Sequence, residues 1–187
     1  MTSLRVVGFS GSTRRPSRTR TLVEAIAKQV ARRRAIRLEL YDLTDAGPDL
    51  GAFTRDALRP GAASIVRALE TADALIVGTP VYKGSYTGLF KHLFDFVDPA
   101  ALAGTPVILS ATGGGTRHSL ITEHQLRPLF GFFEALSMPT SVYASDGDFR
   151  DGAITAPALL KRIDQAAAEL AAFAEPSRSA HPVGRVA

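Results

Sequence analysis

Short, nearly unbroken apolar runs alternate with helical patterns along most of this chain. The runs that read as strands cover residues 4–9, 36–41, 74–80, 106–111 and 141–144. Apolar residues at helical spacing predict helices over residues 19–31, 62–71, 87–96, 119–136 and 158–173. Strands that are apolar at nearly every position are typical of parallel sheets buried on both faces. The alternation predicts an α/β fold with a doubly wound five-stranded parallel sheet, for which right-handed crossovers favour the order 2-1-3-4-5.

The composition limits the organisation and the chemistry of the chain. Its 187 residues are 45% apolar, and we expect a single domain over residues 1–175 and a disordered tail over 176–187. The absence of cysteine excludes disulfides, thiolate metal sites and cysteine nucleophiles. Four scattered histidines predict no metal site, and the acidic segment DGDFRDG lacks the terminal Glu of a calcium loop. With no visible signal peptide or membrane-spanning run, we expect a soluble cytoplasmic protein.

The chain is basic, with a formal charge of +4 and a pI of about 9.8. Its arginines are scattered among acidic residues, and the one run of three, at residues 32–34, ends a predicted helix whose dipole it offsets. We therefore expect no nucleic-acid partner and interpret the arginines as groups that bind anionic small molecules.

Loops rich in glycine and hydroxyl groups follow three of the predicted strands, and ligands of such sheets bind beyond the carboxyl ends of the strands. The first, SGSTRRPSRT, opens a helix and lacks the Walker, dinucleotide and nucleophile-elbow patterns. Its hydroxyls and arginines predict a site for one phosphate monoester, the alternative being an ordinary helix cap with incidental arginines. The candidate ligands are Ser10, Ser12, Thr13, Arg14, Ser17, Arg18 and Thr19.

The second and third loops suit a planar ring. In TPVYKGSYTG, Pro80 fixes the backbone, and Tyr82 and Tyr86 offer flat surfaces, unless they are ordinary packing residues. In ATGGGTRHS, the three glycines expose backbone N–H groups that can hydrogen-bond a ring edge and stabilise negative charge. The alternative for this loop is a plain flexible connection.

Together these three segments resemble the flavodoxin-like NAD(P)H-dependent FMN reductases, above all the reductase components of two-component alkanesulfonate and methanesulfonate monooxygenases. The resemblance spans about residues 4–173. It implies FMN with its phosphate in the first loop, NADPH or NADH as reductant, and an FMNH2-dependent monooxygenase as partner. The isoalloxazine ring would contact the second and third loops, through Pro80, Val81, Tyr82, Lys83, Ser85, Tyr86, Thr112, Gly113, Gly114, Gly115 and His118. The flavin would carry the chemistry, so no side chain is assigned as a catalytic acid or base.

The helix predicted over 119–136 contains a shift in phase. Its later apolar residues keep one helical phase, whereas Leu120 and Ile121 lie one place off it. A one-residue insertion near His124 would produce a π-bulge, a feature frequent at functional sites; alternatively, the helix starts later, near Glu123. Relatives in the family that the chain resembles carry such an insertion near the subunit interface and active site, which implies that His124 tunes flavin release or assembly.

Phenylalanine-rich faces suggest an oligomer. We expect Phe90, Leu93, Phe94, Phe96, Phe130, Phe132 and Phe133 to pack against another subunit. The family forms dimers and tetramers, so a homotetramer is expected, with a homodimer second. Two other functions remain open: a quinone or azo reductase with bound FMN, and a non-enzymatic flavodoxin-type carrier, although such carriers are typically acidic. The sequence does not separate NADH from NADPH, but Arg15, Arg18 and Arg117 offer contacts for a 2′-phosphate.

Overall fold

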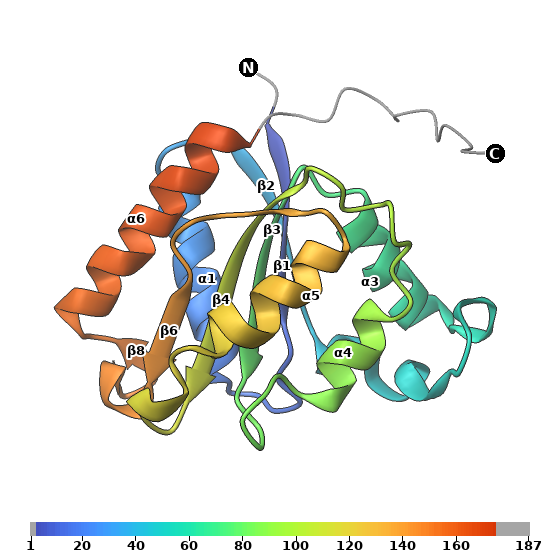
Figure 1. The fold of residues 1–187 in the computed structure, drawn as a ribbon, viewed down its shortest axis with the longest axis horizontal. Coiled ribbons are helices and arrows are strands. Elements are labelled where there is room, and N and C mark those ends of the chain that lie inside the picture. Colours follow the sequence, from blue (N-terminus) through green and yellow to red (C-terminus); the bar gives the residue numbers. More distant parts are fainter. Residues whose placement is uncertain (1–2, 175–187) are drawn as a thin grey trace.

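A computed structural model describes residues 3–174 of the chain. Its main sheet is parallel throughout and has the order β2-β1-β3-β4-β5, with β6 also paired to β4 (Figure 1). The strands are β1 (Leu4–Ser10), β2 (Ile36–Asp42), β3 (Ala74–Pro80), β4 (Pro106–Gly113), β5 (Leu136–Ser137) and β6 (Val142–Ser145). This order confirms the predicted flavodoxin-like sheet. The tail predicted over 176–187 lies outside the described residues.

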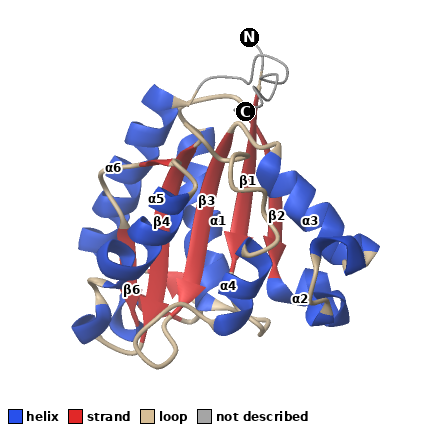
Figure 2. Cartoon of the chain, turned by 45° about the vertical axis from the view of Figure 1, so that its right-hand side comes forward, coloured by secondary structure: helices blue, strands red, loops and turns tan. Residues whose placement is uncertain are grey.

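Helices cover both faces of the sheet (Figures 1 and 2). On one face, α1 (Arg18–Ala31) and α6 (Pro157–Phe173) pack on Val6, Ile76 and Ile108. The other face is covered by α3 (Pro60–Glu70), α4 (Gly88–Phe94) and α5 (Arg127–Phe132), which pack on Val7, Leu75 and Leu109. Consecutive residues of the central strands therefore enter opposite cores, which is why β1, β3 and β4 are largely apolar.

Short elements make up most of the remaining chain. The long segment after β2 contains α2 (Leu43–Ala46) and 3₁₀ helices at Gly47–Gly51 and Arg55–Ala57. The acidic segment DGDFRDG forms a 3₁₀ turn at Asp146–Asp148, followed by the hairpin of β7 (Phe149–Arg150) and β8 (Ala153–Ile154). None of the helices within residues 3–174 is long and apolar enough to cross a membrane.

The fifth strand position is interrupted. β5 pairs with Pro106 and Val107 of β4, and β6 resumes the pairing at Ser110. The residues between them include Pro139, which has no N–H to donate to a ladder. The prediction of a strand over 141–144 therefore covers only the second of two segments. We call residues 138–141 the strand break.

The helix predicted over 119–136 is shorter and begins irregularly. A π turn occupies Thr122–Leu126 and continues into α5, which ends at Phe132. The π turn confirms the π-bulge predicted near His124, and the alternative of a helix that starts later, near Glu123, is wrong. Beyond α5 the chain turns back through Glu134, whose φ is 53°, and joins the sheet at Leu136.

The prediction that the phenylalanine-rich faces meet another subunit is wrong for six of the seven residues. Phe90, Leu93, Phe94, Phe96, Phe130 and Phe133 are at most 5% exposed within this chain. The cause is mutual packing of α4 and α5: the ring of Phe94 lies 4.7 Å from that of Phe90 and 5.1 Å from that of Phe130. Phe132 is 67% exposed and alone agrees with the prediction.

Candidate functional site

The first loop joins the end of β1 to the start of α1. Ser17 caps the helix, since its hydroxyl accepts a hydrogen bond from the backbone N–H of Arg20 at 3.3 Å. The buried Ser10 Oγ has no hydrogen-bond partner among the described residues. Within residues 3–174, the backbone N–H groups of Ser12, Thr13, Arg18 and Thr19 also make no hydrogen bond. Unused donors at the positive end of a 14-residue helix suit an anion.

Two arginines near this loop are already paired with acids. Asp42 is fully buried at the end of β2 and accepts hydrogen bonds from Arg15 at 2.7 and 2.9 Å and from Arg20 at 2.8 Å. Burial alone would raise the pKa of Asp42, but its hydrogen bonds to the two arginines and to Thr44 outweigh burial and lower this pKa to about 2. Arg15 also pairs with Asp45 at 2.6 Å.

Among the arginines suggested for a 2′-phosphate, Arg18 is likewise engaged. It pairs with Asp146 at 2.6 Å, and its guanidinium carbon lies 5.8 Å from the centre of the Phe149 ring. By contrast, Arg14 and Arg117 are exposed and have no ion pair within residues 3–174. The arginines of the site thus fall into two groups: Arg15, Arg18 and Arg20 are paired with acids, whereas Arg14 and Arg117 have no acidic partner among the described residues.

The second loop is a tight turn after β3. Tyr82 and Ser85 exchange backbone hydrogen bonds of 3.0 and 3.2 Å, and the residues between them, Lys83 and Gly84, have φ values of 53° and 82°. Positive φ at both central residues is the pattern of a type I′ turn. The turn presents Tyr82, which is 48% exposed, while Tyr86 packs on Phe90 at 5.9 Å and is half-buried.

The third loop follows β4 and contacts a residue that the sequence did not point to. The hydroxyl of Tyr143 on β6 donates a hydrogen bond to the carbonyl oxygen of Gly115 at 2.5 Å. Neither Gly114 nor Gly115 donates its backbone N–H within the described residues. Tyr143 was missed because nothing local in its short strand marks it: the contact joins residues 28 positions apart.

Hydrogen bonds tie the three loops together. The backbone N–H of Gly11 donates to the carbonyl of Gly78 on β3 at 2.7 Å, and the Thr87 hydroxyl donates to the Gly11 carbonyl at 3.1 Å. The hydroxyls of Thr19 and Thr112 lie 2.6 Å apart and link the first loop to the third. The adjacent ends of β1, β3 and β4 therefore carry one connected surface.

The predicted site residues fall into three groups by burial. Buried are Ser10, Ser12, Thr19 and Thr112; half-buried are Ser17, Pro80, Val81, Ser85, Tyr86, Gly113, Gly115 and His118; exposed are Thr13, Arg14, Arg18, Tyr82, Lys83, Gly114 and His124. The buried members are thus all hydroxyl-bearing residues, and both arginines and the lysine are exposed.

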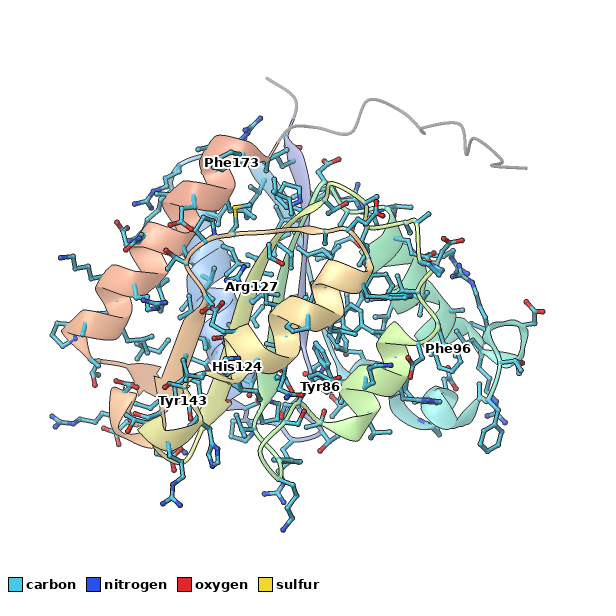
Figure 3. All side chains as sticks on the ribbon, in the orientation of Figure 1. Tyr86, Phe96, His124, Arg127, Tyr143 and Phe173 are labelled. Atoms are coloured by element: carbon cyan, nitrogen blue, oxygen red, sulfur yellow. The ribbon has the colours of Figure 1, made fainter. Side chains whose placement is uncertain are left out.

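The π turn borders this surface. Its Gln125 side-chain oxygen accepts a hydrogen bond from the Ser85 hydroxyl of the second loop at 3.1 Å. His124 is exposed on the same turn and makes no side-chain hydrogen bond within residues 3–174. Tyr86, His124 and Tyr143 all lie toward the lower side of the molecule in Figure 3, where the strands end.

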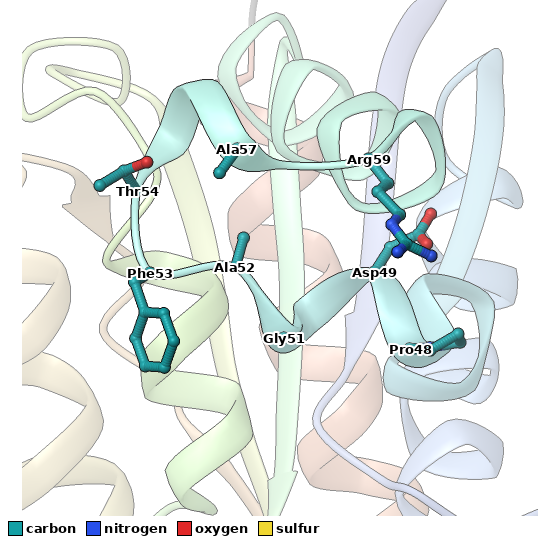
Figure 4. A pocket seen from close by; sticks show the side chains of 8 residues that line it. All are labelled: Pro48, Asp49, Gly51, Ala52, Phe53, Thr54, Ala57 and Arg59. Carbon is teal, nitrogen blue, oxygen red and sulfur yellow. The ribbon is translucent and has the colours of Figure 1, made fainter.

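Two surface hollows lie elsewhere, beside the segment between α2 and α3. The one in Figure 4 has a volume of about 580 Å³ and is lined by residues that include Pro48, Phe53 and Arg59. The other, of about 550 Å³, adjoins it at Phe53 and reaches His92 on α4. None of the predicted site residues lines either hollow, so neither contributes to the surface formed by the three loops. No group of three or more His, Asp or Glu side chains within residues 3–174 could hold a metal ion.

Comparison with known proteins agrees with this architecture. The family model "NADPH-dependent FMN reductase" matches residues 4–149. The chain is 49% identical over 165 residues to the NADH-dependent FMN reductase SfnF of Pseudomonas fluorescens, covering 88% of each chain. It is 47% identical over 169 residues to an FMN reductase (NADPH) of Pseudomonas aeruginosa, covering 89% of this chain and 91% of that one. An oxidoreductase from Corynebacterium diphtheriae has a TM-score of 0.83 at 38% identity, covering 92% of this chain and 97% of that one. This chain belongs to the NADPH-dependent FMN reductase family.

Proposed function

We propose that this protein reduces FMN with a hydride from NADH or NADPH and supplies the reduced flavin to a partner monooxygenase. The observation that carries the proposal is the connected surface at the ends of β1, β3 and β4, which joins a helix N-terminus with unused N–H donors to a tyrosine-bearing turn and a glycine loop. FMN, when bound there, supplies the hydride acceptor. The chain's own residues bind and orient the two nucleotides.

The first loop fits a phosphate group in both geometry and charge. The unpartnered hydroxyl of Ser10 and the unused N–H groups of the loop are donors that need an acceptor. Arg14 adds a cation with no competing acid among the described residues. We assign the phosphate to this loop, with Ser12, Thr13, Ser17 and Thr19 as the further candidate ligands. Arg18, whose guanidinium pairs with Asp146, is a candidate through its backbone N–H, which is unused within residues 3–174.

The second and third loops fit a planar ring. The Tyr82 turn offers an exposed aromatic face, and the N–H groups of Gly114 and Gly115 are unused donors. Such donors can stabilise negative charge on the ring edge. We assign the ring to Pro80, Val81, Tyr82, Lys83, Ser85, Tyr86, Thr112, Gly113, Gly114, Gly115 and His118. No side chain is needed as an acid or base.

Unpaired cations on all three loops favour anionic substrates. Arg14, Lys83 and Arg117 belong to the first, second and third loops, and none has an ion pair within residues 3–174. FMN and both nicotinamide nucleotides carry phosphates, so this arrangement raises their local concentration. Arg117 is the arginine we assign to a 2′-phosphate, because Arg15 and Arg18 are paired with acids.

The proposal also covers the oligomeric state, the partner and the location of the protein. Leu89, Leu120 and Phe132 remain exposed on α4, before the π turn and on α5, and we assign these residues to contacts in a homotetramer, with a homodimer as the alternative. We assign His124 on the π turn to flavin release or assembly. The resemblance to reductase components of two-component sulfonate monooxygenases supports a monooxygenase partner in sulfur assimilation, and the relative SfnF is named as an NADH-dependent FMN reductase. We expect a cytoplasmic location and a single domain.

The test is oxidation of NADH and of NADPH by purified protein over a series of added FMN concentrations. The proposal expects oxidation that rises and saturates with free FMN. Oxidation independent of added FMN, by a protein that keeps its yellow colour through dialysis, would indicate a quinone or azo reductase with bound flavin. A stable flavin radical without oxidation of either nucleotide would indicate an electron carrier.

A further inference from the structure

Tyr143 touches the glycine loop at two points. Its hydroxyl donates to the carbonyl of Gly115, and it also fills the space beside Gly113. A Cβ atom on residue 113 would lie 2.3 Å from the Tyr143 hydroxyl oxygen and 3.3 Å from the ring carbon that bears it. The phenol thus occupies the position that any side chain at residue 113 would need.

The surroundings of Tyr143 fix its backbone and keep its hydroxyl protonated. β6 pairs in parallel with β4, and Tyr143 lies opposite Ala111 in that register. Beyond β6, the carboxylate of Asp148 accepts hydrogen bonds from the backbone N–H and hydroxyl of Ser145 at 2.7 and 2.8 Å. Burial, together with the negative charges of Asp146 and Asp148, raises the pKa of Tyr143, so the phenol stays protonated and remains a donor.

A tether of this kind matters for a glycine loop. Glycine loses more conformational freedom on ordering than any other residue, and a loop that is ordered before binding avoids that cost when the ligand arrives. The bond to the Gly115 carbonyl fixes the far end of the run, while the N–H groups of Gly114 and Gly115 stay unused.

We propose that Tyr143 is a positioning residue for the flavin: its hydroxyl holds the 113–115 loop in the conformation that binds the ring edge. This inference rests on the proposed function. It assigns Tyr143 no contact with the flavin, only the ordering of a loop that makes one.

The first test is Tyr143→Phe, which removes the hydroxyl oxygen and keeps the ring. We expect FMN binding, measured by quenching of flavin fluorescence, to weaken about three- to tenfold, the range of one net hydrogen bond. We also expect faster hydrogen exchange over residues 112–116. Tyr41→Phe is the matched control, because Tyr41 on β2 is also half-buried and donates its hydroxyl to Glu39 at 3.1 Å, not to a residue of the three loops. It should leave both measurements unchanged.

The second test uses the contact at Gly113. Gly113→Ala alone should weaken FMN binding more than tenfold, because the new methyl group and the Tyr143 hydroxyl oxygen cannot share the space. In the double variant Gly113→Ala, Tyr143→Phe, the closest remaining atom is the ring carbon at 3.3 Å, so binding should recover toward that of Tyr143→Phe. Gly114→Ala is the comparison: a Cβ there meets nothing within 4 Å, so its effect should be the same with Tyr or Phe at residue 143.

The outcomes separate this inference from the function on which it rests. If the wild-type protein binds no FMN, the proposed function fails and the inference with it. If the wild type binds FMN and Tyr143→Phe matches it in affinity and exchange, or if the double variant recovers nothing, only the role of Tyr143 is overturned. Thermal unfolding of each variant checks that the chain is folded.

Discussion

Ser141 donates its hydroxyl hydrogen to the carboxylate of Glu123 across 2.7 Å and so joins the strand break to the π turn. The same hydroxyl oxygen lies 2.9 Å from that of Thr122. The Arg127 guanidinium donates two hydrogen bonds to the Glu123 carboxylate, at 2.6 and 3.1 Å, and a third to the Met138 carbonyl at 3.2 Å. The irregular turn and the interrupted strand are therefore one hydrogen-bonded unit, and the turn in turn contacts the second loop through Gln125 and Ser85.

This unit predicts a specific effect of Glu123→Gln. The hydrogen bond from Arg127 is the largest cause of the lowered pKa of Glu123, so the neutral amide loses charge-assisted bonds. We expect a loss of roughly 1 kcal/mol in unfolding free energy, since the pair is partly exposed, and faster hydrogen exchange over residues 122–127.

Glu169→Gln is the matched control for that variant. Glu169 on α6 contacts the same strand break from the opposite face of the sheet. Its carboxylate accepts hydrogen bonds from the Thr140 backbone N–H at 2.8 Å and from the Thr140 hydroxyl at 2.6 Å. It should lower stability without changing exchange in the π turn. Equal rates of hydrogen exchange over residues 122–127 in the two variants would show that Glu123 does not specifically stabilise the π turn.

A second prediction concerns acid stability and Asp42. The pKa of Asp42 in the folded chain is about 2, against an ordinary value of 3.8. Because this pKa is lowered on folding, the stabilisation is complete above the ordinary value and is lost as the pH falls from about 5 toward 2. It amounts to roughly 2 kcal/mol at neutral pH. Urea unfolding of the wild type and of Asp42→Asn across this range should show a steeper acid loss in the wild type, because the lowered pKa values of Glu39 and Glu123 contribute equally to both proteins.

Asp45→Asn controls for the arginine cluster as a whole. Asp45 pairs with the same Arg15 but its side chain is 33% exposed, whereas that of Asp42 is fully buried. The Asp45→Asn protein should keep the acid-dependent loss of stability. Were it to remove that loss as fully as Asp42→Asn does, the assignment to Asp42 would fall.

The sequence predicted local structure well where a single hydrophobic pattern determines it. It predicted less where the structure depends on contacts between residues far apart in the chain. Strands such as Ala74–Pro80 were predictable because both faces are buried and nearly every residue is apolar. The π turn was predictable because the helical phase of the apolar residues shifts before Leu126. By contrast, β5 has two residues, too few to show any periodicity. The phenylalanines of α4 and α5 were misplaced because composition does not reveal that they pack on one another. Tyr143 was missed because its contact with Gly115 joins residues that are far apart in the sequence.

A third prediction tests the close approach of the first loop to α4. A Cβ on Gly11 would lie 2.7 Å from Cδ2 of Phe90, which is fully buried and packed between Phe9 and Phe94. Because that ring has no room to move, Gly11→Ala should cost about 1–3 kcal/mol of unfolding free energy and should displace the loop. Gly88→Ala at the start of α4 is the control, since a Cβ there meets nothing within 4 Å. Similar unfolding free energies for the two variants would contradict the steric argument.

The last prediction separates two neighbouring arginines by their partners. Arg14 is exposed and has no ion pair among the described residues, whereas Arg15 is bound to Asp42 and Asp45. If Arg14 holds the flavin phosphate, Arg14→Gln should weaken FMN binding about tenfold, with little change in stability. Its affinity for riboflavin, which has no phosphate, should not change.

Arg15→Gln should give the opposite result. It leaves the buried carboxylate of Asp42 with one arginine fewer, so the free energy of unfolding should fall by about 1–3 kcal/mol. FMN and riboflavin affinities, measured by fluorescence quenching in conditions where the protein stays folded, should change together and slightly, because this guanidinium is already neutralised. A selective loss of FMN affinity in Arg15→Gln, with none in Arg14→Gln, would mean that Arg15 leaves Asp42 to bind phosphate and that the arrangement of this loop changes when the flavin is bound.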